Sequence, residues 1–168
     1  MKASPPRIYL DANVLLSLVN DAPGRADTVQ SLLEDAEDGK VHLLTSNLSI
    51  AEVAYIDPEQ EPAGSADDET TIDGLWIPDS PVKLAEVSRL VVLKARSIIR
   101  KARVNGTKSV RSADAVHLAT AEINECKRFY TYESKNRTGW DALINADISE
   151  PYVDAPRLPG DRSGGWGG

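Results

Sequence analysis

Four acidic residues that lie far apart in the sequence are placed where a fold could bring their carboxylates together. Asp11 and Glu133 each end a short apolar run, and Glu52 and Asp114 lie in segments with helical spacing. Clustered carboxylates resist ionising together, and a divalent cation is the usual way to hold them charged. All-oxygen ligation suits Mg²⁺ or Mn²⁺. A pair of such ions can activate a water for phosphodiester cleavage.

Each acid also has a purely structural interpretation. Asp11 could cap the helix that follows it, a task that Asp and Asn both do well. Ser49 and Glu52 have the spacing of a capping box. Asp114 follows a predicted cap at Ser112, where it would favour the helix dipole. Glu133 could be the polar end of a strand.

The elements around these acids alternate between short apolar strands and amphipathic helices. We predict strands over 7–10, 41–45, 128–132 and 151–153, and helices over 14–19, 25–37, 48–56, 82–104, 113–126 and 140–144. Such alternation indicates an α/β fold with a mostly parallel central sheet flanked by helices. Open α/β folds bind ligands at the carboxyl edge of the sheet, which is where Asp11 and Glu133 are expected.

The charge of the chain is unevenly distributed. The net charge is −7, but residues 57–80 hold eight acidic residues and no basic one. We predict that this acidic insert is a surface loop or disordered, with residues 75–77 docking part of it. Residues 83–111 instead carry nine basic residues against one acid. They could be a solvated helix face, or they could attract RNA phosphates to an acidic site, with Arg96, Arg100, Lys101 and Arg103 as candidates.

The length of 168 residues fits one domain. We expect it to span 1–156, followed by a disordered tail over 157–168 that is rich in Gly, Pro and Ser.

Cys126 is the one cysteine and excludes an internal disulfide, which fits a reducing cytoplasm. The first apolar run is interrupted by Asp11 and is too short to span a bilayer. We therefore expect a soluble, cytoplasmic protein with no membrane partner.

Four segments resemble the motifs of PIN-domain ribonucleases in order and separation. The sequence IYLDANV at 8–14 is similar to the opening strand followed by Asp-x-Asn, and SNLSIAE at 46–52 to the segment with the second acid. The most specific match is SADAVHLATA at 112–121, which resembles the central helix motif. FYTYE at 129–133 resembles the strand that ends in Thr-x-Asp. The resemblance covers about 7–154 apart from the acidic insert and is closest to VapC-type toxins of toxin–antitoxin pairs.

The resemblance implies a Rossmann-like PIN domain that cleaves single-stranded RNA with Mg²⁺ or Mn²⁺. Asp11, Glu52 and Asp114 match the three core metal-binding acids of the family. Glu133 stands where Asp is the commoner residue, so its longer side chain changes its reach, and Asp141 is an outside candidate for the fourth acid.

Three further residues take their interpretation from this resemblance. Asn13 and Thr131 match positions that support the metal's water shell or its ligands. His117 follows Asp114 by one helical turn and could touch substrate or hold a carboxylate, although such a histidine more often belongs to the core. The implied partners are RNA, a cognate antitoxin protein and a second copy of the chain.

Two other functions remain open on this fold. One is a PIN nuclease of RNA processing or DNA repair. The other is a non-catalytic PIN-like module that binds RNA or a protein, for which the departure at Glu133 is the main support. Binding of Mn²⁺ would distinguish an intact site from a degenerate one.

Overall fold

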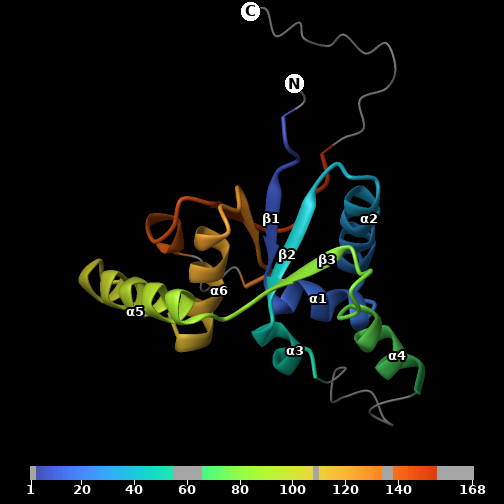
Figure 1. The fold of residues 1–168 in the computed structure, drawn as a ribbon, viewed down its shortest axis with the longest axis horizontal. Helices are drawn as coiled ribbons and strands as arrows, with labels where there is room; N and C mark the ends of the chain where they lie inside the picture. The colour runs from blue at the N-terminus through green and yellow to red at the C-terminus, as the bar shows by residue number, and fades with distance from the viewer. Residues whose placement is uncertain (1–2, 55–65, 108–109, 134–137, 155–168) are drawn as a thin grey trace, which may run out of the picture.

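The centre of the molecule is a five-stranded sheet whose neighbouring strands are all parallel (Figure 1). The computed structural model describes residues 3–54, 66–107, 110–133 and 138–154. The strands are β1 (Arg7–Leu10), β2 (His42–Ser46), β3 (Val82–Ala85), β4 (Arg128–Tyr130) and β5 (Asp147–Ser149). Their order across the sheet is β3-β2-β1-β4-β5. This confirms the predicted α/β class.

Helices cover both faces of this sheet and bury two apolar cores. They are α1 (Ala12–Val19), α2 (Arg25–Glu37), α3 (Leu48–Glu52), α4 (Ala66–Gly74), α5 (Arg89–Val104) and α6 (Ser112–Ile123), with a 3-10 turn η1 (Trp140–Ala142). In Figure 1, α5 and α6 lie on one side of the sheet and α1 and α2 on the other. Successive residues of β1 point to opposite faces. Tyr9 therefore joins the core beside α5 and α6, while Ile8 and Leu10 join the core beside α1 and α2.

The order of the strands creates a switch point between β1 and β4. From β1 the chain crosses to β2 and β3 on one side, and it later returns to β4 and β5 on the other. Open parallel sheets bind ligands in the crevice at such a point, at the carboxyl ends of the strands. Asp11 directly follows β1 there, and Thr131 directly follows β4.

The predicted helix over 82–104 is wrong in its first part. Val82–Ala85 form the edge strand β3, which pairs in register with β2 from Leu43↔Val82 to Ser46↔Ala85. The helix begins only at Arg89, after Ser88, whose Oγ accepts the N–H of Val91 at 3.3 Å. Pro81 therefore precedes an edge strand, a position where its missing N–H is tolerated.

The acidic insert contains regular structure, which corrects the prediction of a loop or disordered segment for that part. Residues 66–74 form α4. Leu75, which directly follows α4 in the sequence, is 6% exposed and belongs to the core beside α1. Trp76 packs on the same core, whereas Ile77 is 52% exposed. Docking is thus confirmed for Leu75 and Trp76 but not for Ile77.

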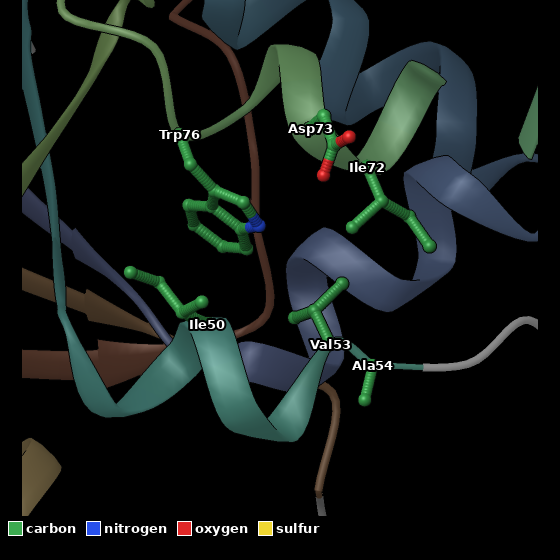
Figure 2. Close-up of a pocket in the computed structure, with 6 residues that line it drawn as sticks. All are labelled: Ile50, Val53, Ala54, Ile72, Asp73 and Trp76. Atoms are coloured by element: carbon green, nitrogen blue, oxygen red, sulfur yellow. The ribbon is translucent and has the colours of Figure 1, made fainter. Parts of the chain in front are cut away.

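Trp76 also closes one side of a pocket of about 340 Å³ between α3 and α4 (Figure 2). Five of the six lining residues are of apolar type, and Asp73 contributes the single charged group: the residues are Ile50, Val53, Ala54, Ile72, Asp73 and Trp76. The pocket thus borders the helix that carries Glu52.

Two predictions near the C-terminal end of the described chain need correction. The last strand is β5 at Asp147–Ser149 and not 151–153, and Ile148 pairs with Phe129. The predicted helix over 140–144 is the single turn η1, with Trp140 buried. The predicted tail over 157–168, and the part of the acidic insert at 57–65, lie outside the described residues.

Candidate metal centre

Asp11 lies where β1 passes into α1, and its carboxylate has partners on both sides. Its Oδ1 accepts the N–H of Ala12 at 2.9 Å, which caps α1. Its Oδ2 accepts hydrogen bonds from Thr131 Oγ1 at 3.0 Å and from Asn13 Nδ2 at 3.1 Å. Asp11 therefore caps the helix as its type suggests, and the same bonds hold its carboxylate in one orientation at the switch point.

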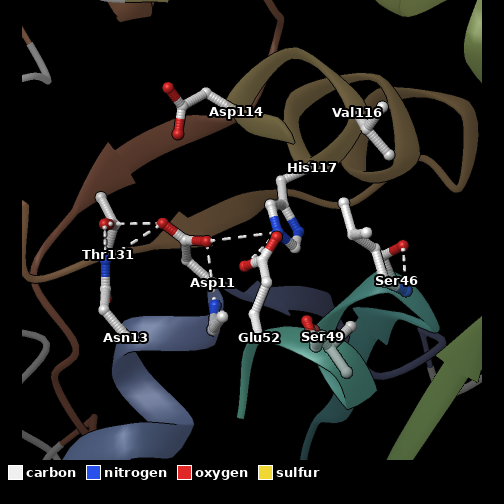
Figure 3. Close-up of polar contacts among 12 residues, drawn as sticks. Asp11, Asn13, Ser46, Ser49, Glu52, Asp114, Val116, His117 and Thr131 are labelled. Carbon is white, nitrogen blue, oxygen red and sulfur yellow. Dashed lines mark hydrogen bonds and ion pairs between the residues drawn. The ribbon is translucent and has the colours of Figure 1, made fainter. Parts of the chain in front are cut away.

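Asn13 and Thr131 connect the ends of β1 and β4 around this carboxylate. Asn13 Nδ2 also donates to Thr131 Oγ1 at 2.9 Å, and Asn13 Oδ1 accepts the N–H of Tyr132 at 3.0 Å. Both predicted supporting residues thus contact Asp11 directly (Figure 3).

Glu52 ends the short helix α3 and reaches toward α6. Its two carboxylate oxygens each lie 3.0 Å from His117 Nε2. Ser49 Oγ forms a hydrogen bond with Thr45 Oγ1 at 2.7 Å instead of capping the helix, so the alternative of a capping box is not realised. The observed helix α3 is four residues shorter than predicted, since it stops at Glu52 and not at residue 56.

His117 is buried between these acids and the core. Its Nε2 lies 3.0 Å from Glu52 Oε2 and 3.8 Å from Asp11 Oδ1, and its Nδ1 lies 2.5 Å from the hydroxyl of Tyr9. The histidine is therefore a buried core residue whose ring nitrogens both have partners, and it also holds a carboxylate. Both roles considered for it from the sequence are present together. One ligand atom from each of Asp11, Glu52 and His117 lies within 4.8 Å of the others, and this group could hold a metal ion.

Asp114 lies in the first turn of α6, near this group but not within it. Its Oδ2 accepts the N–H of Arg111 at 2.9 Å, and Arg111 is the N-cap, so the predicted cap at Ser112 is one residue too late.

Glu133 is exposed and follows β4. Its charge raises the pKa of both Asp11 and Asp114, which places it within electrostatic reach of the two. Asp141 lies on η1 and is exposed.

The acids are held in surroundings that resist their ionisation. Burial raises the pKa of Asp11, although His117, Thr131 and the Ala12 amide lower it. Burial also raises the pKa of Asp114. Burial lowers the pKa of His117, but Glu52, Asp11 and Asp114 together raise it above its ordinary value. Bound positive charge would favour the ionised form of both carboxylates.

The basic residues predicted to bind RNA are exposed on α5. Arg96, Arg100, Lys101 and Arg103 point away from the stripe of Val91, Ala95, Ile98 and Ala102 that is buried in the core shared with α6. Large apolar side chains lie among them on the exposed surface: Leu90, Val92, Leu93, Ile99 and Val104. The outer side of α5 is therefore a mixed apolar and basic surface, which the sequence prediction of a basic face missed.

Comparison with known proteins identifies the family. The model of the PIN domain matches residues 8–137, which include Asp11, Glu52, His117, Asp114 and Glu133. The chain belongs to the PIN domain family. A search of the curated proteins finds no match to this chain.

Solved structures share the fold of this PIN domain at low sequence identity. VapBC2 from Rickettsia felis bound to a promoter DNA fragment is 14% identical with a TM-score of 0.64, covering 86% of this chain and 98% of that one. A toxin–antitoxin complex from Klebsiella pneumoniae is 18% identical with a TM-score of 0.56, covering 88% and 99%. VapC20 from Mycobacterium tuberculosis, a sarcin–ricin loop cleaving toxin, is 12% identical with a TM-score of 0.57, covering 83% and 98%. The predicted resemblance to VapC-type PIN proteins is confirmed.

Within the part of this PIN domain that the structure describes, no helix is both long and apolar enough to cross a bilayer.

Proposed function

We propose that this PIN domain is a metal-dependent endoribonuclease that hydrolyses phosphodiester bonds of single-stranded RNA. The observation that carries the proposal is the buried carboxylate of Asp11, which is fixed by Asn13 and Thr131 and lies in one group with Glu52 at the switch point. Two carboxylates this close favour a cation bound between them, since neighbouring like charges disfavour the ionisation of both. Asp114 and Glu133 extend the acidic surroundings of that cation.

The donor set fits Mg²⁺ or Mn²⁺, since carboxylate oxygens are the ligands these ions prefer. Asp11 and Glu52 would bind the ion, with Asp114 and Glu133 closing the site. The bound ion would supply charge neutralisation and an activated water. Asn13 and Thr131 keep Asp11 in the orientation that the ion needs, and this ordering is complete before RNA binds.

The basic residues of α5 would attract the RNA that the acidic site repels. Arg96, Arg100, Lys101 and Arg103 are exposed together and would contact phosphates without reading the sequence. VapC20 from Mycobacterium tuberculosis, which has a similar fold, is a toxin that cleaves the sarcin–ricin loop, and this supports RNA as the substrate class.

We further propose that the protein is the toxin of a toxin–antitoxin pair and acts in the cytoplasm. The structure of similar fold from Klebsiella pneumoniae is a toxin–antitoxin complex, which supports an antitoxin partner. The mixed apolar and basic surface of α5 suits a protein partner, either the antitoxin or a second copy of the chain.

The proposal is tested by incubating the purified protein with a single-stranded RNA and Mn²⁺. We expect cleavage that EDTA abolishes. Asp11→Asn should remove the activity with the fold retained, and Glu34→Gln, which changes an exposed acid on α2, should leave it unchanged. Full activity in folded Asp11→Asn protein would contradict the site assignment.

A non-catalytic PIN-like module is the second candidate function, favoured by the exposed Glu133 in place of the commoner Asp. Such a module would bind RNA or a protein without cleaving RNA. Tight RNA binding with no cleavage at any Mn²⁺ concentration would favour it. A nuclease of RNA processing or DNA repair would instead cleave structured RNA or DNA in preference to single strands.

A further inference from the structure

His117 belongs to the group that could hold a metal ion, but its hydrogen bonds indicate a different task. We infer that His117 is a positioning residue that directs the carboxylate of Glu52 toward the cation site and does not itself bind the ion, and that Tyr9 fixes its ring. The inference rests on the proposed function, because it assigns a role within the proposed metal site.

His117 Nε2 faces the carboxylate of Glu52. The two oxygens of Glu52 lie 3.0 Å from this nitrogen, and an ionised carboxylate offers only acceptors. An unprotonated Nε2 would point a lone pair at both oxygens, so Nε2 carries a hydrogen that Glu52 accepts. A nitrogen that carries a hydrogen has no lone pair for a metal ion.

Tyr9 contacts the other nitrogen of the His117 ring, Nδ1. Tyr9 Oη accepts the N–H of Ser46 at 3.0 Å, and its own hydrogen can then be donated to His117 Nδ1. With Nδ1 accepting this hydrogen, Nε2 is the ring nitrogen that donates, and its hydrogen is directed at Glu52. Tyr9 is itself immobile, because its ring is fully buried and stacks on Phe129 with 5.1 Å between the ring centroids.

Glu52 lies at the end of a short helix. Helix α3 has five residues, its N-cap Asn47 makes no side-chain capping bond, and the Glu52 side chain is 31% exposed. A long side chain at such a helix end has several accessible rotamers, and restricting them costs entropy. The bond from His117 selects a rotamer directed at Asp11, so Glu52 is ordered before the ion arrives.

The consequence is measurable as metal affinity, independently of RNA cleavage. Loss of a residue that orients a metal ligand typically lowers metal affinity by about 10–100-fold. We expect a Mn²⁺ dissociation constant raised by a factor in this range for His117→Leu, which removes the donor. His117→Gln, whose amide can donate from a similar position, should recover most of the affinity, and Tyr9→Phe should fall between the two.

The matched control uses the second of the two histidines in the chain. His42 begins β2 and is exposed at the amino edge of the sheet, away from the acids. His42→Gln should bind Mn²⁺ like the wild type. It also leaves His117 as the sole histidine, so that any histidine signal in a spectrum belongs to that residue.

The decisive experiment is pulsed EPR of Mn²⁺ bound to the His42→Gln protein, together with Mn²⁺ titrations of the variants. We expect no coupling from a directly bound imidazole nitrogen, and weaker binding in His117→Leu with recovery in His117→Gln. A strong coupling from bound imidazole would overturn the inference even if His117→Leu fails to fold. Unchanged affinity in folded His117→Leu would overturn it as well. Failure of the wild type to bind Mn²⁺ would instead contradict the proposed function.

Discussion

Asp11 combines two tasks in one carboxylate, and this combination explains how an acid is tolerated in the core. One oxygen caps α1, while the other accepts two side-chain hydrogen bonds from Thr131 and Asn13. Burial nevertheless raises its pKa. The hydrogen bonds thus offset only part of the cost of burying a charge, and a cation would offset the remainder.

Asp114 provides a test of this electrostatic cost without disturbing the hydrogen bonds of the centre. Its pKa is raised by burial, so the folded protein binds this proton more tightly than the unfolded chain. The folded state therefore loses stability as pH rises from the ordinary carboxyl value through the raised one. Asp114→Asn, which keeps an acceptor for the Arg111 amide, should gain stability relative to the wild type over that window. Urea unfolding in EDTA between about pH 4 and 7 measures the difference. A difference that does not grow with pH would contradict the prediction.

Glu133 and Asp114 should contribute unequally to Mn²⁺ affinity and RNA cleavage. Glu133 is exposed and has a longer side chain, whereas Asp114 is half-buried and fixed by the Arg111 amide. We expect Glu133→Ala to lower Mn²⁺ affinity and RNA cleavage less than Asp114→Ala, with activity returning in part at raised Mn²⁺. Parallel Mn²⁺ titrations and cleavage assays decide the ranking, which would be reversed if Glu133→Ala were the more damaging change.

At the scale of elements, α5 carries the charges that would meet RNA. Each lost phosphate contact on a single strand should reduce the slope of log affinity against log salt by about 0.7. Replacing Arg96, Arg100 and Arg103 together by Gln should therefore weaken RNA binding and flatten its salt dependence. Replacing Lys40 and Lys127, which lie at the amino edge of the sheet, is the control. An unchanged slope in the triple variant would show that these three arginines do not contact RNA phosphates.

Most elements could be predicted from the sequence because their apolar residues follow a clear period. The edge strand β3 was one exception, since its burial does not alternate and Leu84 continues the helical spacing toward Val91. Sheet pairing with β2 overrode that spacing. The helix α4 was missed because an acidic segment without periodicity gives no local sign of a helix.

The geometry of the candidate metal centre was predictable only in part. The resemblance to PIN domains pointed to Asp11, Glu52 and their supporting residues as candidates, but the contact of Glu52 with His117 joins residues 65 positions apart. The bond between His117 and Tyr9 spans 108 positions. Local spacing contains no information on such pairs, which arise from packing α6 onto the sheet.

At the scale of the whole molecule, cation binding should stabilise the fold, because the acids come together only when β1, α3, β4 and α6 are in place. A ligand at 100 times its dissociation constant stabilises the folded state by about 2.7 kcal/mol. We expect saturating Mn²⁺ to raise the free energy of unfolding by about this amount, with little effect in Asp11→Asn. Urea unfolding with Mn²⁺ and with EDTA provides the comparison, and equal stabilisation of the two proteins would place the ion elsewhere.

The anomalous scattering of Mn²⁺ in a crystal of the protein is the most direct test of whether the acids at the switch point hold a catalytic cation. We predict a peak in contact with the carboxylates of Asp11 and Glu52, on the side that faces Asp114 and Glu133, with His117 bonded to Glu52 and not to the ion. Crystals of Asp11→Asn should lose that peak. A wild-type map with no peak among these acids at saturating Mn²⁺, or a peak that persists in Asp11→Asn, would contradict the account.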